Sequence, residues 1–223
     1  MRKTNHKYLE KLVKVAYNKK KPLFVWGTTG IGKSQTVKKM AQQIAKEKGL
    51  EYNENVRDIN NERKFSVVDL RASQLDPSDL RGLPRLDGET TRWLPPNWLP
   101  KASHGILFPD EMNLAPPSVQ SAFYQLILDR RLGDYVLPDG WSIIAAGNRM
   151  EDRAAIFEMA APLQNRFMHI ELGVPSKEDW TEWAINNGVD TKVITFLTSS
   201  PVYCSDGTRK SKRKRFRLPV LGK

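Results

Sequence analysis

The most chemically specific stretch of the sequence is a glycine-rich segment that ends in lysine and serine. Residues 27–34 read Gly-Thr-Thr-Gly-Ile-Gly-Lys-Ser and fit G-x-x-x-x-G-K-[ST], the pattern of a phosphate-binding loop. Glycines allow a tight turn that brings backbone N–H groups to phosphate oxygens, and the start of the following helix attracts the same anion. Lys33 can reach the β- and γ-phosphates, and the Ser34 hydroxyl can bind Mg²⁺. A glycine-rich turn with a merely solvated lysine is the alternative.

The sequence on either side of the loop supports the phosphate-binding interpretation. An apolar, strand-like run at 23–26 precedes the loop, and apolar residues at helical spacing follow it at 34–48. This strand–loop–helix order is the context that the motif requires. The residues expected to bind the nucleotide are Gly27, Thr28, Thr29, Gly30, Ile31, Gly32, Lys33, Ser34 and Gln35.

Two adjacent carboxylates follow a second apolar run. Residues 105–109 lead directly into Asp110 and Glu111. After a phosphate-binding loop, Asp110 is expected to hold Mg²⁺, directly or through water, and Glu111 to orient and polarise the attacking water. Successive side chains of a strand point to opposite sides, so the two carboxylates can take different roles. Without the loop, a solvated strand end would be the simpler interpretation.

Two further polar residues adjoin strand-like runs. Asn148 follows the run at 141–146, where its side chain can hydrogen-bond the γ-phosphate or the attacking water; an ordinary turn residue is the alternative. Arg166 precedes the run at 168–172, where a ring ATPase would project an arginine into the neighbouring subunit's site. A helix-end arginine in a surface ion pair is the alternative there. The catalytic candidates are Lys33, Glu111, Asn148 and Arg166, and the metal candidates are Ser34 and Asp110.

Several other segments can be interpreted from residue pattern alone. Apolar spacing predicts helices at 6–18 and from Pro117, and 65–70 is strand-like. The polar residues 50–64 are expected to form a loop. Residues 85–103 are rich in proline, glycine and tryptophan and are expected to form a hairpin-like excursion or an ordered loop. Their tryptophans either pack inside the protein or stay exposed to contact a substrate or partner.

Composition and charge limit the class of protein. A chain of 223 residues suggests one domain, or one domain and a fragment of a second. It has no apolar run near 18 residues and no secretory signal, and its single cysteine, Cys204, fits a reducing compartment, so we expect a cytoplasmic protein without a membrane partner. Residues 205–223 carry eight Lys or Arg and one Asp, which gives +7 of the net charge of +11. The basic run 209–217 is expected to be a disordered tail, with salt-sensitive contact to nucleic acid or another polyanion as the alternative.

The order of these motifs resembles the AAA+ ATPases of the MoxR-like, dynein-related group. The resemblance runs from about residue 22 to about residue 197. Beyond the phosphate loop it is carried by Asp-Leu-Arg at 69–71, Asp-Glu-Met-Asn at 110–113, Gly-Asn-Arg at 147–149 and Asn-Arg-Phe at 165–167. The resemblance identifies 27–34 as Walker A, Asp110-Glu111 as Walker B, Asn148 as sensor 1 and Arg166 as the arginine finger.

The resemblance also implies a fold and a set of partners. The expected fold is α/β, a P-loop three-layer sandwich with a five-stranded parallel sheet and a helical lid. The expected domains are an ATPase core at 1–174, a partial, shortened lid at 175–200 and a basic tail at 201–223. Family members hold ATP with Mg²⁺ between the subunits of a ring, usually a hexamer, and remodel partner proteins, often ones with von Willebrand factor A domains.

The resulting hypothesis is an ATP-hydrolysing chaperone or remodelling motor. The alternative is a slowly hydrolysing, nucleotide-gated scaffold or DNA-associated switch that uses the basic tail. A GTPase is disfavoured because the sequence has no N-K-x-D motif for guanine. A small-molecule kinase is disfavoured because Glu111 and its neighbouring carboxylate, together with Asn148 and Arg166, favour attack by water.

Overall fold

A computed structural model of the chain describes residues 3–148, 157 and 159–199. The chain divides into two compact units, Met1–Leu172 and Gly173–Lys223. Arg149, within the Gly-Asn-Arg motif, and the basic run 209–217 lie outside the described residues. The candidate catalytic, nucleotide and metal residues all belong to the first unit.

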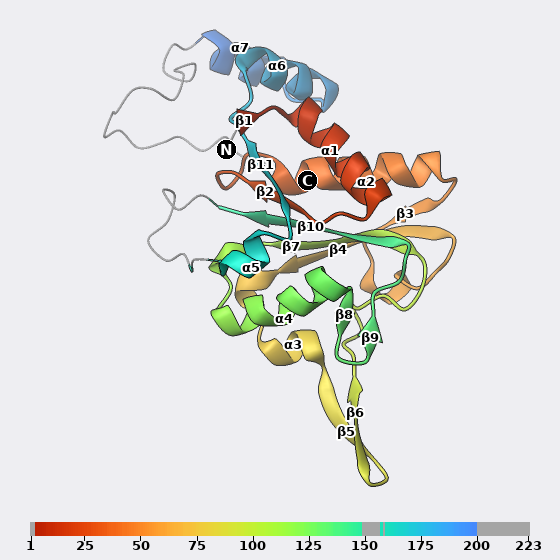
Figure 1. Cartoon of the computed structure of the whole chain (residues 1–223). Helices are drawn as coiled ribbons and strands as arrows, with labels where there is room; N and C mark the ends of the chain where they lie inside the picture. The colour runs from red at the N-terminus through yellow and green to blue at the C-terminus, as the bar shows by residue number, and fades with distance from the viewer. Residues whose placement is uncertain (1–2, 149–156, 158, 200–223) are drawn as a thin grey trace. The chain divides into compact units, whose positions relative to one another are not determined.

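The first unit is built around a parallel sheet of seven strands (Figure 1). The central five strands are the five that the sequence predicts, so the α/β fold class is confirmed. The predicted number of strands was wrong, because a short strand is added at each edge. In spatial order the strands are β1 (Lys3–Thr4), β11 (Met168–Leu172), β2 (Leu23–Trp26), β10 (Trp141–Gly147), β7 (His104–Asp110), β4 (Lys64–Arg71) and β3 (Glu51–Asn53).

The two edge strands lack the apolar pattern by which a strand is found in sequence. β1 pairs with β11 in parallel, with Lys3 opposite Glu171, and β3 pairs with β4, with Tyr52 opposite Phe65. Both strands are two or three residues long and mostly polar. They are held by backbone hydrogen bonds to the neighbouring strand rather than by burial of apolar side chains, so the expectation of a loop throughout 50–64 was wrong at β3.

Helices cover both faces of this sheet (Figure 1). Alternate strand residues point to opposite faces, so Val25 packs in one apolar cluster with the helices α1 and α2, whereas Phe24 packs in another with α3, α4 and α5. This arrangement gives the three layers expected from the resemblance. The helices are α1 (His6–Lys19), α2 (Lys33–Glu47), α3 (Pro77–Arg81), α4 (Pro117–Asp129) and α5 (Ala161–Gln164), with single 3₁₀ turns η1 (Val56–Asp58), η2 (Ala72–Gln74) and η3 (Met112–Leu114).

Two antiparallel hairpins add to this core, β5–β6 (Leu83–Asp87 and Thr90–Leu94) and β8–β9 (Arg131–Leu132 and Tyr135–Val136). The hairpin predicted within 85–103 is therefore confirmed. Every residue of β5 and β6 is exposed, and the hairpin extends away from the sheet and its helices (Figure 1). The tryptophans of this segment differ: Trp93 is 44% exposed, whereas Trp98 is buried.

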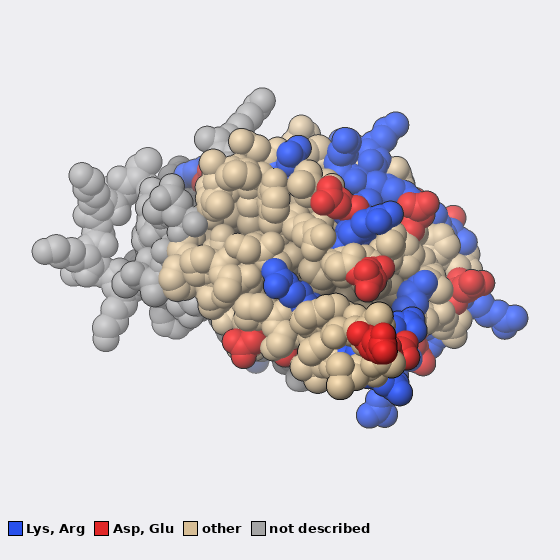
Figure 2. Space-filling view, turned by 60° about the horizontal axis from the view of Figure 1, so that its bottom comes forward, with Lys and Arg blue, Asp and Glu red and all other residues tan. Residues whose placement is uncertain are grey.

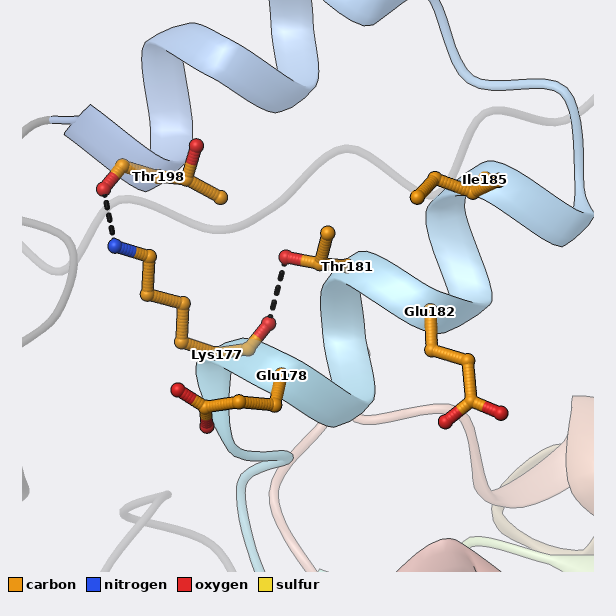
Figure 3. A pocket seen from close by; sticks show the side chains of 6 residues that line it. All are labelled: Lys177, Glu178, Thr181, Glu182, Ile185 and Thr198. Atoms are coloured by element: carbon orange, nitrogen blue, oxygen red, sulfur yellow. Dashed lines mark hydrogen bonds between the residues drawn. The ribbon is translucent and has the colours of Figure 1, made fainter.

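The second unit contains two described helices, α6 (Lys177–Asn186) and α7 (Thr191–Ser199). The Lys177 ammonium donates a hydrogen bond to the backbone carbonyl of Thr198, which joins the start of α6 to the end of α7 (Figure 3). An open hollow of about 610 Å³ lies beside this bond. No glycine-rich turn contributes to its lining, so it has no resemblance to a phosphate site. In the part of the chain that the structure describes, no helix combines the length and apolar character needed to cross a membrane.

Candidate active site

The phosphate-binding loop lies between the end of β2 and the start of α2. Gly30 and Gly32 have φ angles of +81° and +94°, values that glycine adopts readily and other residues rarely. Because β2, β10 and β7 are parallel neighbours, their carboxyl ends meet at one edge of the sheet. The loop, Asn148 and Asp110 are therefore brought together at the position where ligands bind in open α/β sheets.

Lys33 is the centre of the hydrogen bonding in this loop. Its side chain is buried, and its Nζ donates to the backbone oxygens of Gly27 (2.7 Å) and Thr28 (3.1 Å) and to Oδ1 of Asn148 (3.3 Å). A buried ammonium needs such oxygen partners, since its desolvation is otherwise costly. The Lys33 ammonium thus connects the phosphate-binding loop to Asn148, the residue that follows β10.

Ser34 and Asp110 form the part of the site that fits Mg²⁺. The Ser34 hydroxyl donates to Oδ2 of Asp110 at 3.1 Å. Both groups offer hard oxygen ligands, and Mg²⁺ is commonly held by one or two protein oxygens together with waters and substrate phosphates. The donor set therefore fits the ion that the family resemblance implies.

Glu111 adopts a conformation that is unusual for a residue with a side chain. Its φ is +55°, and non-glycine residues in this region often mark functional sites where surrounding contacts enforce the strain. Its backbone N–H donates to Oδ1 of Asp110 at 2.8 Å, and its Oε2 accepts a hydrogen bond from Ser73 at 2.7 Å. Ser73, which lies in η2, could not be predicted from the sequence, because no motif distinguishes it.

Asn148 is supported by Asn113, a second residue that sequence analysis did not assign a role. Asn113 Nδ2 donates to the backbone oxygen of Asn148 (2.7 Å), and Asn113 Oδ1 accepts from its N–H (3.0 Å). The Oδ1 of Asn148 accepts from Lys33 and from the Thr29 hydroxyl (3.2 Å). Its Nδ2 is buried without a hydrogen-bond partner in the described part of the chain. The position of Asn113, two residues after Glu111, was the available signal.

An acidic group adjoins the metal candidates. Asp69, near the end of β4, lies 3.4 Å from the Lys38 ammonium. Burial raises the pKa of Asp69, and the charge of Asp110 raises it further, whereas Lys38 lowers it. The carboxyl ends of β4 and β7 therefore concentrate negative charge beside the loop.

The loop is also held from the amino-terminal side. The His6 Nε2 atom lies 2.8 Å from the backbone oxygen of Ile31. His6 is the first residue of α1, whose packing against α2 brings the imidazole to the loop. No spacing rule in the sequence indicates this contact.

Arg166 takes no part in the hydrogen-bonded group around Lys33. Its side chain is exposed, and no hydrogen bond or ion pair holds its guanidinium among the residues that the structure describes. It follows α5 and directly precedes Phe167, which is buried. The arginine is thus anchored by the backbone while its charge faces outward.

Comparisons with known proteins identify the family and the fold. A family model described as AAA domain (dynein-related subfamily) matches residues 22–167. The structure of a candidate ATPase from Cytophaga hutchinsonii ATCC 33406 is similar, with a TM-score of 0.54 and 20% sequence identity, over 90% of this chain and 53% of that chain. This likeness shows a shared fold, and the chain spans about half the length of that protein.

Two further structures are similar over smaller shares of their chains. NtrX from Brucella abortus in complex with ADP has 17% identity and a TM-score of 0.47, over 82% of this chain and 41% of that chain. RuvB from Thermotoga maritima, a Holliday junction branch migration motor, has 18% identity and a TM-score of 0.44, over 79% and 47%. A search of curated proteins found no match.

Proposed function

Because the chain belongs to the AAA domain family, in its dynein-related subfamily, we propose that residues 27–35 bind Mg·ATP and that Glu111 directs its hydrolysis. Membership of this family supports nucleotide binding and ATPase activity. The roles of individual residues, the assembly into a ring and the action on a client protein are our proposals. The single observation that carries the assignment is the hydrogen bond from Lys33 to Asn148. It joins the loop to the tip of β10 at the place where a terminal phosphate would lie.

The proposed mechanism divides the work among the described side chains. Lys33 neutralises charge on the phosphate oxygens, and backbone N–H groups of the loop donate hydrogen bonds to them. Ser34 and Asp110 would hold Mg²⁺, which when bound neutralises charge on the phosphates. Ser73 orients the Glu111 carboxylate, whose other oxygen can accept a proton from the attacking water.

Asn148 is proposed to sense the terminal phosphate. Its buried Nδ2 has donor capacity that the described residues leave unused, and a buried amide without a partner is costly. A γ-phosphate oxygen or the attacking water would satisfy this donor. The hydrogen bonds from Asn113 fix the backbone that carries it.

We further propose that catalysis is completed between subunits. The exposed side chain of Arg166 has no hydrogen-bond or ion-pair partner among the residues that the structure describes, as expected for a charge supplied to a neighbouring site. Rings of six are the arrangement that the family resemblance implies. The conformational changes that accompany hydrolysis would then act on a client protein.

The β5–β6 hairpin is the surface that best fits contact with a client protein. Large apolar side chains that are 44–81% exposed gather in this hairpin, namely Leu83, Leu86, Trp93 and Leu94. Apolar side chains that lie exposed together often mark interaction sites. On the face in Figure 2, the Lys and Arg side chains lie among Asp and Glu side chains. A nucleic acid favours a surface of one sign, which this face does not present; the alternative of a DNA-associated switch uses the basic run 209–217.

The experiment that tests this function compares Glu111→Gln with wild type. The variant should bind ATP with unchanged affinity in the presence of Mg²⁺, while turnover falls by about 100-fold or more because general base catalysis contributes about 10²–10⁴-fold. Glu47→Gln, which removes an exposed carboxylate from the end of α2, is the matched control and should retain full turnover. Turnover in Glu111→Gln equal to wild type would overturn the assignment.

A further inference from the structure

His169, in β11, is hydrogen-bonded at both of its ring nitrogens. Its Nδ1 lies 2.9 Å from Nε1 of Trp26, and its Nε2 lies 2.7 Å from the backbone oxygen of Gln164. An indole N–H can only donate and a carbonyl can only accept. His169 is therefore a neutral imidazole with its proton on Nε2.

The two partners of His169 belong to two separate parts of the proposed mechanism. Trp26 is the last residue of β2 and is directly followed by Gly27, where the phosphate-binding loop begins. Gln164 is the last residue of α5 and precedes Arg166 by two positions. One side chain thus connects the subunit's own loop to the segment that presents its arginine.

An aromatic cluster holds this connection on one face of the sheet. Phe24 lies opposite His169 in the register of β2 and β11. Its ring is 4.4 Å from that of Trp26 and 5.3 Å, edge to face, from that of Phe167, measured between centroids. Arg166 is therefore exposed between two fixed residues, Gln164 and the buried Phe167, which limits how its backbone can move.

We propose that His169 is a positioning residue that locks the start of the phosphate-binding loop to the segment carrying Arg166. This inference rests on the proposed function, because it needs Arg166 to act on a neighbouring subunit. A change in the loop on binding or release of nucleotide would be transmitted through Trp26 and His169 to the arginine that the subunit offers. The occupied state of one site would thereby influence the next.

Two substitutions break the same hydrogen bond from opposite sides. In His169→Gln the amide nitrogen can still donate to the Gln164 carbonyl, but no acceptor remains at the position of Nδ1 to receive the Trp26 N–H; Trp26→Phe keeps an aromatic ring but removes the donor. If both act through this one bond, combining them should add little to either alone. Trp98→Phe is the matched control, because it removes a similar indole hydrogen bond, to the Asp79 carbonyl at 3.1 Å, elsewhere in the same unit.

The test mixes subunits that have lost different halves of a shared site. Arg166→Ala chains keep their own site but lack the arginine, whereas Glu111→Gln chains lack turnover but keep the arginine. Mixing them should restore ATP hydrolysis, because the second chain completes the site of the first. Each of the three substitutions is then placed in the Glu111→Gln chain, which serves only as the arginine donor, and thermal unfolding checks that every donor is folded.

The expected result is that donors with His169→Gln or Trp26→Phe restore at least five-fold less activity, whereas donors with Trp98→Phe restore it fully. If folded donors with His169→Gln or Trp26→Phe restore as much activity as the donor that carries only Glu111→Gln, the positioning role is overturned and the proposed function still stands. An unmodified pair that shows no restoration would contradict the shared site itself, and the inference would fall with it.

Discussion

Asn148 is proposed to carry two tasks in the site. Its Oδ1 accepts a hydrogen bond from the buried Lys33, and its Nδ2, which has no partner among the described residues, is proposed to bond a group that arrives with the substrate. Replacing it with alanine should leave ATP affinity nearly unchanged, because Lys33 retains the backbone oxygens of Gly27 and Thr28. The hydrolysis rate should fall by about 10²–10³-fold, the usual effect of losing one preorganised donor.

Single-turnover hydrolysis together with fluorescent nucleotide titration separates these two effects of Asn148→Ala. Asn187→Ala, in the second unit, removes an asparagine amide that donates to the Trp183 carbonyl and serves as the control. An unchanged hydrolysis step in Asn148→Ala would contradict the sensing role.

Asp69 is expected to make stability depend on pH. Burial raises its pKa in the folded protein above the ordinary value of 3.8, so the folded state binds more protons than the unfolded state between these two values. Its contribution to stability is therefore fully present below pH 3.8 and is lost as pH rises through the folded pKa. Asp69→Asn removes this loss, and the stability of the variant relative to wild type should increase from pH 4 to pH 7.

Urea unfolding of Asp69→Asn and wild type at several pH values measures that difference. Taking the difference between the two proteins cancels the titrating groups that do not interact with Asp69 or its partner Lys38. A difference in unfolding free energy that stays constant or falls with pH would show that Asp69 is not under this strain.

At the scale of elements, the end of β10 is packed so closely that it needs glycine. A Cβ on Gly147 would lie 2.6 Å from Oδ1 of Asn113 and 2.8 Å from the ring of Phe24. Gly147→Ala should therefore displace Asn113 from the backbone of Asn148, destabilise the protein by about 1–3 kcal/mol as overpacking does, and lower turnover.

Chemical unfolding and steady-state ATPase rates test the Gly147→Ala prediction together. Gly88→Ala, at the tip of the β5–β6 hairpin, is the control. A Cβ added there would have no described atom within 4 Å, so only the φ of +61° disfavours alanine. It should cost about 1 kcal/mol and leave turnover unchanged. Wild-type stability and turnover in Gly147→Ala would show that the strand end can relax.

The elements that carry strong periodic patterns could be predicted from the sequence, and those held by backbone pairing could not. α1, α2 and the five central strands each bury an apolar face, which leaves a readable pattern. β1 and β3 gain their stability from hydrogen bonds to a neighbouring strand, which any residue can make. The exposed β5–β6 hairpin was predictable because its turn and proline residues mark it locally.

The same distinction applies to the candidate site. Lys33, Ser34 and Asp110 belong to local motifs, and the parallel sheet then brings them together. Ser73 and His169, in contrast, form hydrogen bonds with residues far away in the chain. Ser73 and Glu111 are 38 residues apart, and His169 and Trp26 are 143 residues apart. Such contacts depend on strand order and register, which the spacing of single residues does not encode.

At the scale of the whole molecule, we propose that full activity requires more than one chain. The site around Lys33 contains the phosphate loop, the metal candidates and Asn148, whereas Arg166 follows α5, is exposed and has no hydrogen-bond or ion-pair partner among the described residues. An arginine supplied in trans can contribute about 10³–10⁵-fold to phosphoryl transfer. The activity of each subunit should therefore depend on assembly.

The most direct test measures the ATPase rate per subunit as protein concentration is raised, for wild type, Arg166→Ala and the control Arg63→Ala, which alters an exposed arginine at a turn. We expect the rate per subunit to climb with concentration in wild type and in Arg63→Ala, and to stay at least 100-fold lower in Arg166→Ala at every concentration. A rate that is independent of concentration and unaffected by Arg166→Ala would contradict a site shared between subunits.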